Sequence, residues 1–375
     1  MDFRHRCVYH DILNDMIKEK GANMKEENTL EHLRTELNSV NDEILDLLLK
    51  RGHIVEEIGA VKQKAGLPPY DPEREEKMLM NIKQKDTAPY QPIHVQRIFK
   101  TIFDASKEIQ DINRKKILLV SRQNQASDTH VKVNGTVIGN GARTMIFGPC
   151  AVESYEQMDK VGALLSQKGE TFIRGGAFKP RTSPYDFQGL GEEGLKILKD
   201  VGKKYNLNTV SEIVDTRHVE LAHEYLDVFQ VGARNAQNFE LLKEIGKTEK
   251  PVLFKRGMSM TISEYIHAAE YIAANGNNNI ILCERGIRTF EKETRNTLDI
   301  SAVPILKQQT HLPVIVDITH STGRKDIMAH IAKAAIAVGS DGLMCEIHPT
   351  PSVALSDASQ QLDFDEFEVL YQLIK

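Results

Sequence analysis

The sequence predicts an α/β protein: a closed (β/α)8 barrel, the TIM-barrel fold, preceded by a smaller all-α unit of three helices. Two observations support this prediction. Over residues 144–375 eight short, β-rich apolar runs alternate with amphipathic segments, and before residue 113 apolar residues recur at helical spacing. Eight strand-then-helix units in succession are typical of a closed parallel barrel. A doubly wound open sheet is the alternative, which the regular succession of eight units disfavours.

The composition is that of an ordinary globular protein, long enough for one large and one smaller domain. The 375 residues are 41% hydrophobic and 27% charged, with a net charge of −5. This balance argues against a nucleic-acid or membrane-surface partner, and no run approaches the roughly 20 apolar residues of a membrane span. The first 20 residues lack the apolar core of a secretory signal, and four scattered cysteines form no CxxC pair. We therefore expect a cytoplasmic protein.

Residues 1–23 show no clear period and precede a second methionine, Met24. Two interpretations stay open: a misplaced start, with the natural chain beginning at Met24, or a short extra helix. The first domain is therefore expected to span residues 24–112.

Three helices are expected in this domain. Apolar residues recur at helical spacing from 28 to 64, which predicts one helix near 37 residues long. A helix well past 25 residues usually needs a bundle or a partner chain to bury its apolar stripe. The proline-containing segments 66–72 and 87–92 interrupt the pattern, so further helices are expected at 72–85 and 93–112.

Residues 113–143 are expected to form a linker that contains a short β-hairpin. The polar SRQNQASDTH leads into VKVNGTVIGNG, in which apolar runs flank Asn-Gly. This arrangement is a strong short-range signal for a hairpin. The barrel domain then covers 144–375, with strands expected at 144–149, 171–177, 208–213, 228–233, 251–256, 280–285, 313–319 and 342–347.

Charged side chains stand where the predicted strands end, which is where barrels of this kind have their active sites. A single strand-end Arg or Lys is usually a solvated surface charge, but a set on one rim indicates a binding site. Phosphates and carboxylates are the expected ligands, because Arg binds them by bidentate hydrogen bonds. The strand ends and the loops after them carry Cys150, Arg174, Lys179, Arg181, Glu212, Arg234, Lys255, Arg285, His320, Glu346 and Asp357.

Four of these residues form a candidate metal site: Cys150, His320, Glu346 and Asp357. Taken singly, Cys150 is more often a buried small apolar residue and His320 a satisfied polar one. They follow strands one, seven and eight, which become neighbours when the barrel closes. A thiolate, an imidazole and two carboxylates suit a divalent ion such as Mn, Fe, Co or Zn, with an open position for substrate.

Long motifs in the second domain resemble one enzyme family. The segments GPCAVES, RGGAFKPRTSPYDFQGLG, VGARN, FKRGM, ERGIRTFE, DITHSTG and EIHPTP…LSDASQQL are similar to those of 3-deoxy-D-arabino-heptulosonate 7-phosphate (DAHP) synthases. The resemblance is to the subgroup related to octulosonate phosphate synthase, and it covers residues 144–375. It implies the condensation of phosphoenolpyruvate with erythrose 4-phosphate, the first step towards the aromatic amino acids.

The same resemblance implies roles for the strand-end residues. Arg174, Lys179 and Lys255 would face the carboxylate of phosphoenolpyruvate, while Arg234 and Arg285 would hold its phosphate. Arg181 and Thr182, with Ser183 beside them, would bind the phosphate of erythrose 4-phosphate. The metal would polarise the aldehyde as a Lewis acid.

The N-terminal motifs LRTELNSVNDEILDLLLKR…VKQKAGLPPYDPEREE…IFDASKEIQ resemble the all-α chorismate mutase over residues 28–112. This implies the rearrangement of chorismate to prephenate, which needs no nucleophile. Two arginines would bind the carboxylates, a lysine and a glutamine the ether oxygen, and a glutamate the ring hydroxyl. The matching positions are Arg34 and Arg51, Lys62 and Gln110, Glu75, and in addition Asp71, Arg74 and Ser106.

Helix geometry makes a separate prediction about three of these residues. Arg51 and Lys62 are 11 residues apart, so they lie within about 20° of one helix face. Arg34 precedes Arg51 by 17 residues, which places it about 25 Å away and about 100° off that face. Arg34 must then serve the pocket of a partner chain. We expect a dimer through the helical domain and a tetramer overall. The alternative is a dimerisation helix whose basic residues are solvated.

The sequence thus predicts a bifunctional enzyme that binds phosphoenolpyruvate, erythrose 4-phosphate, chorismate and prephenate, with feedback inhibition through the helical domain. One alternative is a 3-deoxy-manno-octulosonate 8-phosphate synthase barrel, which uses arabinose 5-phosphate, joined to a non-catalytic regulatory domain. Another is that the helical domain senses chorismate or prephenate with little turnover. The KPRTS segment and the fusion itself favour the four-carbon aldose.

Overall fold

The computed structural model describes residues 4–65, 67, 71–112, 117–181 and 183–375; side chains are described from Thr29 onwards, except those of 63 and 110–112. The chain divides into two compact units, Met1–Lys116 and Ile117–Lys375. Each unit is described by itself. No helix in the described residues is long and apolar enough to cross a membrane.

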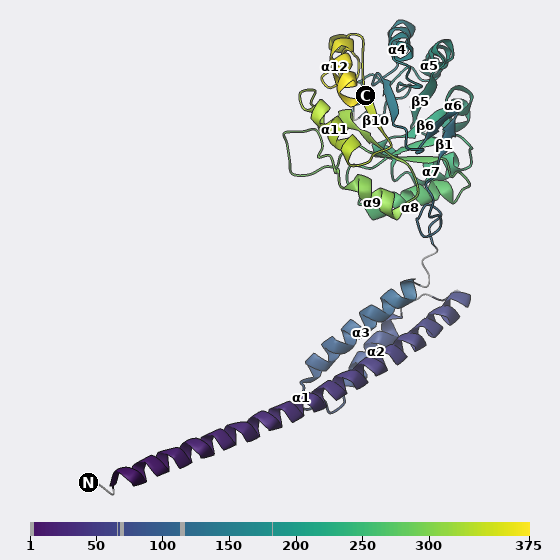
Figure 1. The fold of residues 1–375 in the computed structure, drawn as a ribbon. Helices are drawn as coiled ribbons and strands as arrows, with labels where there is room; N and C mark the ends of the chain where they lie inside the picture. The colour runs from purple at the N-terminus through teal and green to yellow at the C-terminus, as the bar shows by residue number, and fades with distance from the viewer. Residues whose placement is uncertain (1–3, 66, 68–70, 113–116, 182) are drawn as a thin grey trace. The chain divides into compact units, whose positions relative to one another are not determined.

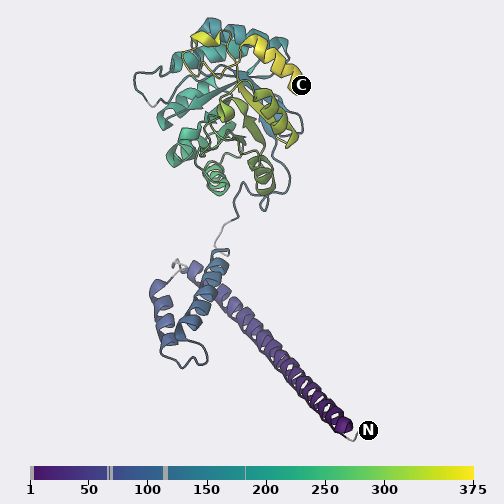
Figure 2. The ribbon, with the colours of Figure 1, turned by 90° about the vertical axis from the view of Figure 1, so that its left-hand side faces the viewer.

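The first unit consists of α1 (Arg4–Lys64), α2 (Pro72–Lys83) and α3 (Pro92–Ile112). The two shorter helices lie along the C-terminal half of α1 (Figures 1 and 2). Asp71 caps α2 by accepting a 3.1 Å hydrogen bond from the Arg74 backbone N–H, and Pro72 occupies the first helical position.

The helix α1 starts at Arg4, whereas the sequence predicts a start near residue 28. The physical reason is that residues 4–27 contain no proline and a single glycine, so nothing strongly breaks the helix there. The extra residues are continuous with α1 rather than a separate helix. Where the natural chain begins stays a prediction.

Much of the apolar stripe on α1 is exposed within the single chain. Leu37 is 59% exposed and Leu47 is 66% exposed. Such a stripe normally lies against another helix. The exposed large apolar residues of α1 in the described part are Leu30, Leu33, Leu37, Val40, Ile44, Leu45, Leu47, Leu48, Leu49, Ile54 and Val61.

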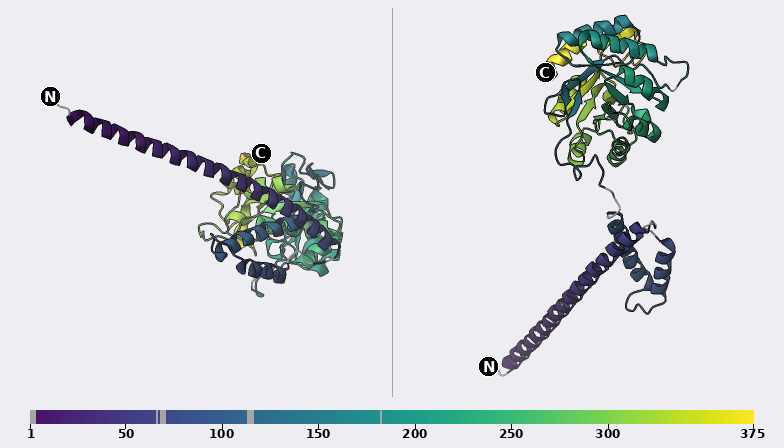
Figure 3. Two further views of the ribbon diagram at one scale, coloured as in Figure 1. Left: turned by 90° about the horizontal axis from the view of Figure 1, so that it is seen from below. Right: turned by 90° about the vertical axis from the view of Figure 1, so that its right-hand side faces the viewer.

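The second unit is built on a closed barrel of eight parallel strands in the described residues, ordered β10-β3-β4-β5-β6-β7-β8-β9. Figure 3 shows the strands at its centre and the helices outside. Closure occurs between β10 and β3, where Glu346 pairs with Gly148. The predicted barrel and its strand succession are confirmed. The strands are β3 (Thr144–Gly148), β4 (Phe172–Arg174), β5 (Asn208–Ile213), β6 (Val228–Val231), β7 (Val252–Lys255), β8 (Ile280–Glu284), β9 (Val314–Asp317) and β10 (Gly342–Glu346).

Amphipathic helices cover the barrel, and apolar residues such as Phe147, Phe229 and Phe367 fill the space between the two layers. The helices are α4 (Tyr155–Gln167), α5 (Glu192–Tyr205), α6 (Val219–Tyr225), α7 (Phe239–Gly246), α8 (Ile262–Ala273), α9 (Ala302–Gln309), α10 (Ile318–Thr322), α11 (Met328–Ala337) and α12 (Phe364–Ile374). Short 3-10 turns are η1 (Thr216–His218), η2 (Ala233–Asn235) and η3 (Pro351–Val353).

The predicted hairpin forms from β1 (Val131–Val133) and β2 (Thr136–Ile138). Its turn residues Asn134 and Gly135 have φ angles of 42° and 89°, the left-handed conformation that Asn-Gly supplies. The hairpin is not part of a free linker. Its buried valines and isoleucine pack against Phe172 and other residues at the strand starts. Residues 117–143 therefore belong to the barrel unit and close the end opposite the active-site rim.

Candidate active sites

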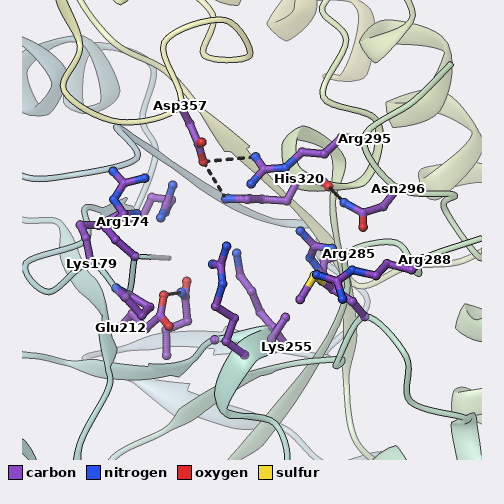
Figure 4. Close-up of a pocket in the computed structure, with 17 residues that line it drawn as sticks. Arg174, Lys179, Glu212, Lys255, Arg285, Arg288, Arg295, Asn296, His320 and Asp357 are labelled. Carbon is purple, nitrogen blue, oxygen red and sulfur yellow. Dashed lines mark hydrogen bonds and ion pairs between the residues drawn. The ribbon is translucent and has the colours of Figure 1, made fainter. Parts of the chain in front are cut away.

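A cavity of about 250 Å³ opens at the C-terminal ends of the barrel strands. Figure 4 shows side chains from different strands pointing into one space. The cavity unites most of the predicted barrel residues, although they come from several different strands and loops. Those in its lining are Arg174, Lys179, Arg181, Glu212, Arg234, Lys255, Arg285, His320 and Asp357.

Two of the cations expected to bind a carboxylate are already paired with buried carboxylates of the chain. Arg174 NH1 lies 2.7 Å from Glu346 Oε1, and Lys255 Nζ lies 2.5 Å from Asp317 Oδ2. Burial opposes the charge of Arg174, but Glu346, Cys150 and Asp317 together outweigh it and raise the pKa of the guanidinium. These pairs hold the two cations at the cavity wall.

Lys179 reaches the cavity from the loop after β4. Its Nζ donates to the carbonyl O of Cys150 at 3.1 Å and approaches the Cys150 Sγ at 3.0 Å. Gly176 leaves room for this path, since a Cβ there would lie 2.9 Å from both the Lys179 Cδ and the Cys150 O. Burial opposes the charge of Lys179, yet Cys150 and Glu346 raise its pKa overall.

Arg181 lies farther along the same loop and is only partly buried. Its Nε donates to the Phe187 carbonyl at 3.2 Å, while its buried NH2 has no hydrogen-bond partner among the described residues. A guanidinium with an unused donor in a cavity rich in cations is suited to a phosphate. Thr182 lies outside the described residues. Ser183 does not line the cavity, and its hydroxyl accepts from the Tyr185 N–H at 3.2 Å.

The opposite wall carries Arg234 of η2 and Arg285, which directly follows β8. Burial lowers the pKa of Arg285. Arg288 joins them, and its backbone N–H is fixed by a 2.8 Å hydrogen bond to the Met258 carbonyl. Among the residues lining the cavity, Glu212 and Asp357 supply the carboxylates, so positive charge is in excess. Such a cavity favours anionic ligands.

The four predicted metal ligands come together beside this cavity. The Cys150 Sγ and one donor atom each of His320, Glu346 and Asp357 lie within 4.8 Å of one another. His320 Nε2 lies 3.3 Å from Glu346 Oε1 and 3.8 Å from Asp357 Oδ2. Asp357 has a φ of 50°, an uncommon conformation for a residue other than glycine. One thiol, one imidazole and two carboxylates fit a borderline divalent ion.

A metal ion that binds at this site would displace a proton from the Cys150 thiol. Burial and the nearby charge of Glu346 raise the pKa of the Cys150 thiol to about 11. The thiol is therefore protonated at neutral pH, and a metal must displace that proton. The Cys150 N–H donates to Gln361 Oε1 at 2.8 Å, and its Sγ lies 2.9 Å from the Ser356 Oγ. Both contacts fix the thiol toward the other ligands.

Side chains that the sequence reasoning missed support these ligands. Gln360 Nε2 donates to Glu346 Oε2 at 2.8 Å and to Asp357 Oδ2 at 3.2 Å. Arg295 NH1 lies 2.6 Å from Gln360 Oε1 and 3.2 Å from Asp357 Oδ2. Gln360 lies inside the motif LSDASQQL, which is the signal that could have drawn attention to it. Arg288 lies inside ERGIRTFE, whereas Arg295 has no comparable local signal.

A second pocket of about 130 Å³ lies between the three helices of the first unit. Arg51 NH1 donates to the Ser106 hydroxyl, and its guanidinium lies 5.4 Å from the centre of the Phe103 ring. Burial lowers the pKa of Arg51. The pocket unites most of the predicted helical-domain residues: Arg51, Lys62, Asp71, Arg74, Glu75 and Ser106.

One predicted residue of the helical domain, Arg34, does not line this pocket. Arg34 is largely exposed and pairs with Glu31 at 2.6 Å. The side chain of Gln110 lies outside the described part of the chain. The pocket also contains Lys107, which the sequence reasoning missed and whose Nζ lies 3.0 Å from Glu75 Oε2.

Comparisons with known proteins match both units. Residues 119–375 match the DAHP synthetase I family, and residues 33–111 match chorismate mutase type II. A phospho-2-dehydro-3-deoxyheptonate aldolase of Thermotoga maritima is 52% identical over 257 residues, which is 68% of this chain and 76% of the relative. A 2-dehydro-3-deoxyphosphooctonate aldolase of Francisella philomiragia is 32% identical over 265 residues, 65% of this chain and 95% of the relative.

Solved structures support the same family assignment for the barrel unit. The crystal structure of the Thermotoga maritima DAHP synthase superposes with a TM-score of 0.67 at 52% identity, covering 69% of this chain and 76% of that one. A truncated form of a synthase from the same organism gives 0.64 at 49% identity, covering 68% of this chain and 93% of that one. With its closed barrel, its cationic cavity and the matched residues, the chain belongs to the DAHP synthetase I family and carries a chorismate mutase type II domain at its N-terminal side.

Proposed function

We propose that the barrel condenses phosphoenolpyruvate with erythrose 4-phosphate to DAHP and phosphate, and that the helical unit converts chorismate to prephenate. The observation that supports the first activity best is a single cavity in which an excess of cations borders a four-ligand metal site. Two phosphorylated substrates repel each other, so an enzyme that joins them must supply compensating positive charge.

Phosphoenolpyruvate fits the deeper part of the cavity. Arg174, Lys179 and Lys255 lie together and would bind its carboxylate, with Arg234 and Arg285 opposite for its phosphate. Because internal carboxylates hold Arg174 and Lys255 in place, little reorganisation is needed when substrate binds.

Erythrose 4-phosphate fits the outer part. The unused NH2 of Arg181 is the natural donor to its phosphate, with Thr182 and Ser183 next in sequence. A divalent ion held by Cys150, His320, Glu346 and Asp357 supplies a Lewis acid for the aldehyde. The enol carbon of phosphoenolpyruvate then forms a bond to the aldehyde carbon. Water adds to the resulting cationic carbon, and phosphate leaves.

The reaction proposed for the helical unit is pericyclic, so groups that bind and orient chorismate are sufficient and no nucleophile is needed. Arg51 would bind a carboxylate of chorismate, Lys62 the ether oxygen and Glu75 the ring hydroxyl. Asp71 has its carboxylate engaged in the helix cap, so its backbone is the part left to meet a ligand. We infer that Arg34, which lies outside this pocket, completes the pocket of a partner chain. The exposed apolar stripe on α1 supports a dimer through this helix.

A tetramer overall, a cytoplasmic location and feedback inhibition by chorismate or prephenate complete the proposal. Feedback requires that the chain have two arrangements and that the ligand bind one of them more tightly. A ligand with equal affinity for both arrangements would not shift the equilibrium between them. The octulosonate alternative, with arabinose 5-phosphate as aldose, has less support, because identity is 52% to the heptonate aldolase and 32% to the octonate aldolase.

The test is an assay of the purified chain on both reactions. Erythrose 4-phosphate and arabinose 5-phosphate are compared with phosphoenolpyruvate as partner, and chorismate is supplied separately. We expect DAHP from the four-carbon aldose and prephenate from chorismate. A preference for arabinose 5-phosphate would contradict the barrel assignment, and binding of chorismate without turnover would leave the helical unit as a sensor.

A further inference from the structure

Asp317 lies between two parts of the barrel site without lining the cavity itself. It ends β9 and caps α10, with Oδ1 accepting from the backbone N–H of Thr319 at 3.2 Å and of His320 at 3.0 Å. Its other oxygen, Oδ2, lies 2.7 Å from His320 Nδ1 and 2.5 Å from Lys255 Nζ. The carboxylate is fully buried, so it acts on the site only through these neighbours.

The contact with His320 fixes how that ring presents itself. A carboxylate only accepts hydrogen bonds, so His320 Nδ1 carries the proton that points to Asp317. The lone pair of Nε2 then faces Glu346 and Asp357, where a metal ligand is required. Carboxylates behind a metal-bound histidine orient the ring and raise its basicity.

The contact with Lys255 crosses the barrel interior. Lys255 ends β7 and Asp317 ends β9, with β8 between them in the sheet. The Lys255 side chain is only 5% exposed, and a buried ammonium is costly without a compensating charge. Asp317 supplies that charge and holds Nζ at the cavity wall.

We propose that Asp317 is a positioning residue that couples substrate binding to metal binding: one carboxylate oxygen holds both the Lys255 ammonium and the His320 ring. The part of this inference that concerns phosphoenolpyruvate binding rests on the proposed condensation. The part that concerns metal binding rests on the geometry of His320 alone. Neutralising Asp317 therefore affects two properties together: the affinity for the divalent ion and the Michaelis constant for phosphoenolpyruvate.

The experiment uses the full chain and the variant Asp317→Asn, whose side-chain oxygen still caps α10. Mn²⁺ and Zn²⁺ dissociation constants are measured by competition with a chelator, and KM is measured for each substrate. We expect metal dissociation constants to rise about 10- to 100-fold. KM for phosphoenolpyruvate should rise several-fold, while KM for erythrose 4-phosphate should stay within about twofold.

Asp341→Asn is the matched control. Asp341 accepts from the Val314 N–H at 2.8 Å and pairs with Lys307 at 2.8 Å, at the opposite end of β9. Its neutralisation weakens an ion pair with α9 beside the start of the same strand without touching the site. Thermal unfolding of both variants measures how much stability each one loses. Only Asp317→Asn should change the affinity for metal.

Lys255→Met tests the coupling even if Asp317→Asn does not fold. Lys255 is not a metal ligand, but its removal leaves Asp317 a stronger acceptor for His320, so metal binding should tighten several-fold. An unchanged metal affinity in Lys255→Met, or a change in metal affinity without a change in KM for phosphoenolpyruvate in Asp317→Asn, would overturn the proposal. A wild-type chain that binds metal but does not condense the two substrates would instead refute the proposed function.

Discussion

The Lys179 ammonium lies 3.0 Å from the Cys150 Sγ, so a predicted substrate-binding cation and a predicted metal ligand are neighbours. Gly176 makes this contact sterically accessible. We predict that Gly176→Ala raises KM for phosphoenolpyruvate and weakens metal binding together, each by about tenfold, because the new methyl group displaces the lysine stem and the Cys150 carbonyl. Steady-state kinetics and metal titration measure the two effects. A change in neither would mean that the loop relaxes around the methyl group.

The barrel reaction should need a divalent ion bound through a reduced Cys150. Chelation is expected to abolish condensation and to leave the mutase reaction unchanged, because the helical pocket contains no part of the ligand cluster. Cys150→Ser should lower the metal content measured by elemental analysis. Cys283→Ala is the control, since Cys283 is a buried core residue outside the cluster. Full condensation by metal-free protein would contradict this prediction.

Binding of erythrose 4-phosphate should depend on Arg181, through a contact with the phosphate of the sugar. We expect Arg181→Ala to raise KM for erythrose 4-phosphate at least tenfold and KM for phosphoenolpyruvate less than about threefold, because a charge-assisted phosphate contact is lost at one substrate alone. Arg217→Ala serves as control, because Arg217 is 82% exposed and pairs with Asp215 away from the cavity. Equal increases for both substrates would refute the assignment.

Arg34 and Arg51 should complement each other between chains. Either Arg34→Ala or Arg51→Ala is expected to reduce mutase kcat/KM by about 100-fold or more, through the loss of a carboxylate contact. Co-expressed chains carrying one change each should recover activity, because each mixed dimer has one pocket in which both arginines are intact. Mixed dimers as inactive as the single variants would mean that both arginines of a pocket come from one chain, which would disprove the shared site.

Feedback control should reside in the helical unit. A chain that starts at Ile117, where the barrel unit begins, keeps the β1–β2 hairpin and is expected to condense its substrates without responding to prephenate or chorismate. Arg51→Ala in the full chain should lose the response in the same way, because it removes a ligand contact. Inhibition curves measure both. A truncated barrel that is inhibited as strongly as the full chain would locate the sensor elsewhere.

Periodicity and strand ends were sufficient to predict the barrel, the helical unit and most of the residues in the barrel cavity, whereas the residues of the helical pocket were predicted from the resemblance to chorismate mutases. Those features are local in sequence, as in the run VIVD that ends at Asp317. Contacts between residues on different strands or loops leave no local pattern in the sequence. Asp317 meets Lys255 across β8, and Arg295 meets Asp357 from 62 residues away, so neither partnership could be inferred from spacing. The hairpin was predicted as structure but not as part of the barrel, because its burial depends on a cluster with residues from all eight barrel strands.

The β1–β2 hairpin also has a kinetic consequence. With one end of the barrel filled by Val131, Val133 and Ile138, both substrates must use the single opening at the other end. Arg174 and Lys255 are buried near the floor of that opening, whereas Arg181 lies partly exposed along its path. Occupation of the outer position first would obstruct the inner one. We therefore expect phosphoenolpyruvate to bind before the sugar phosphate.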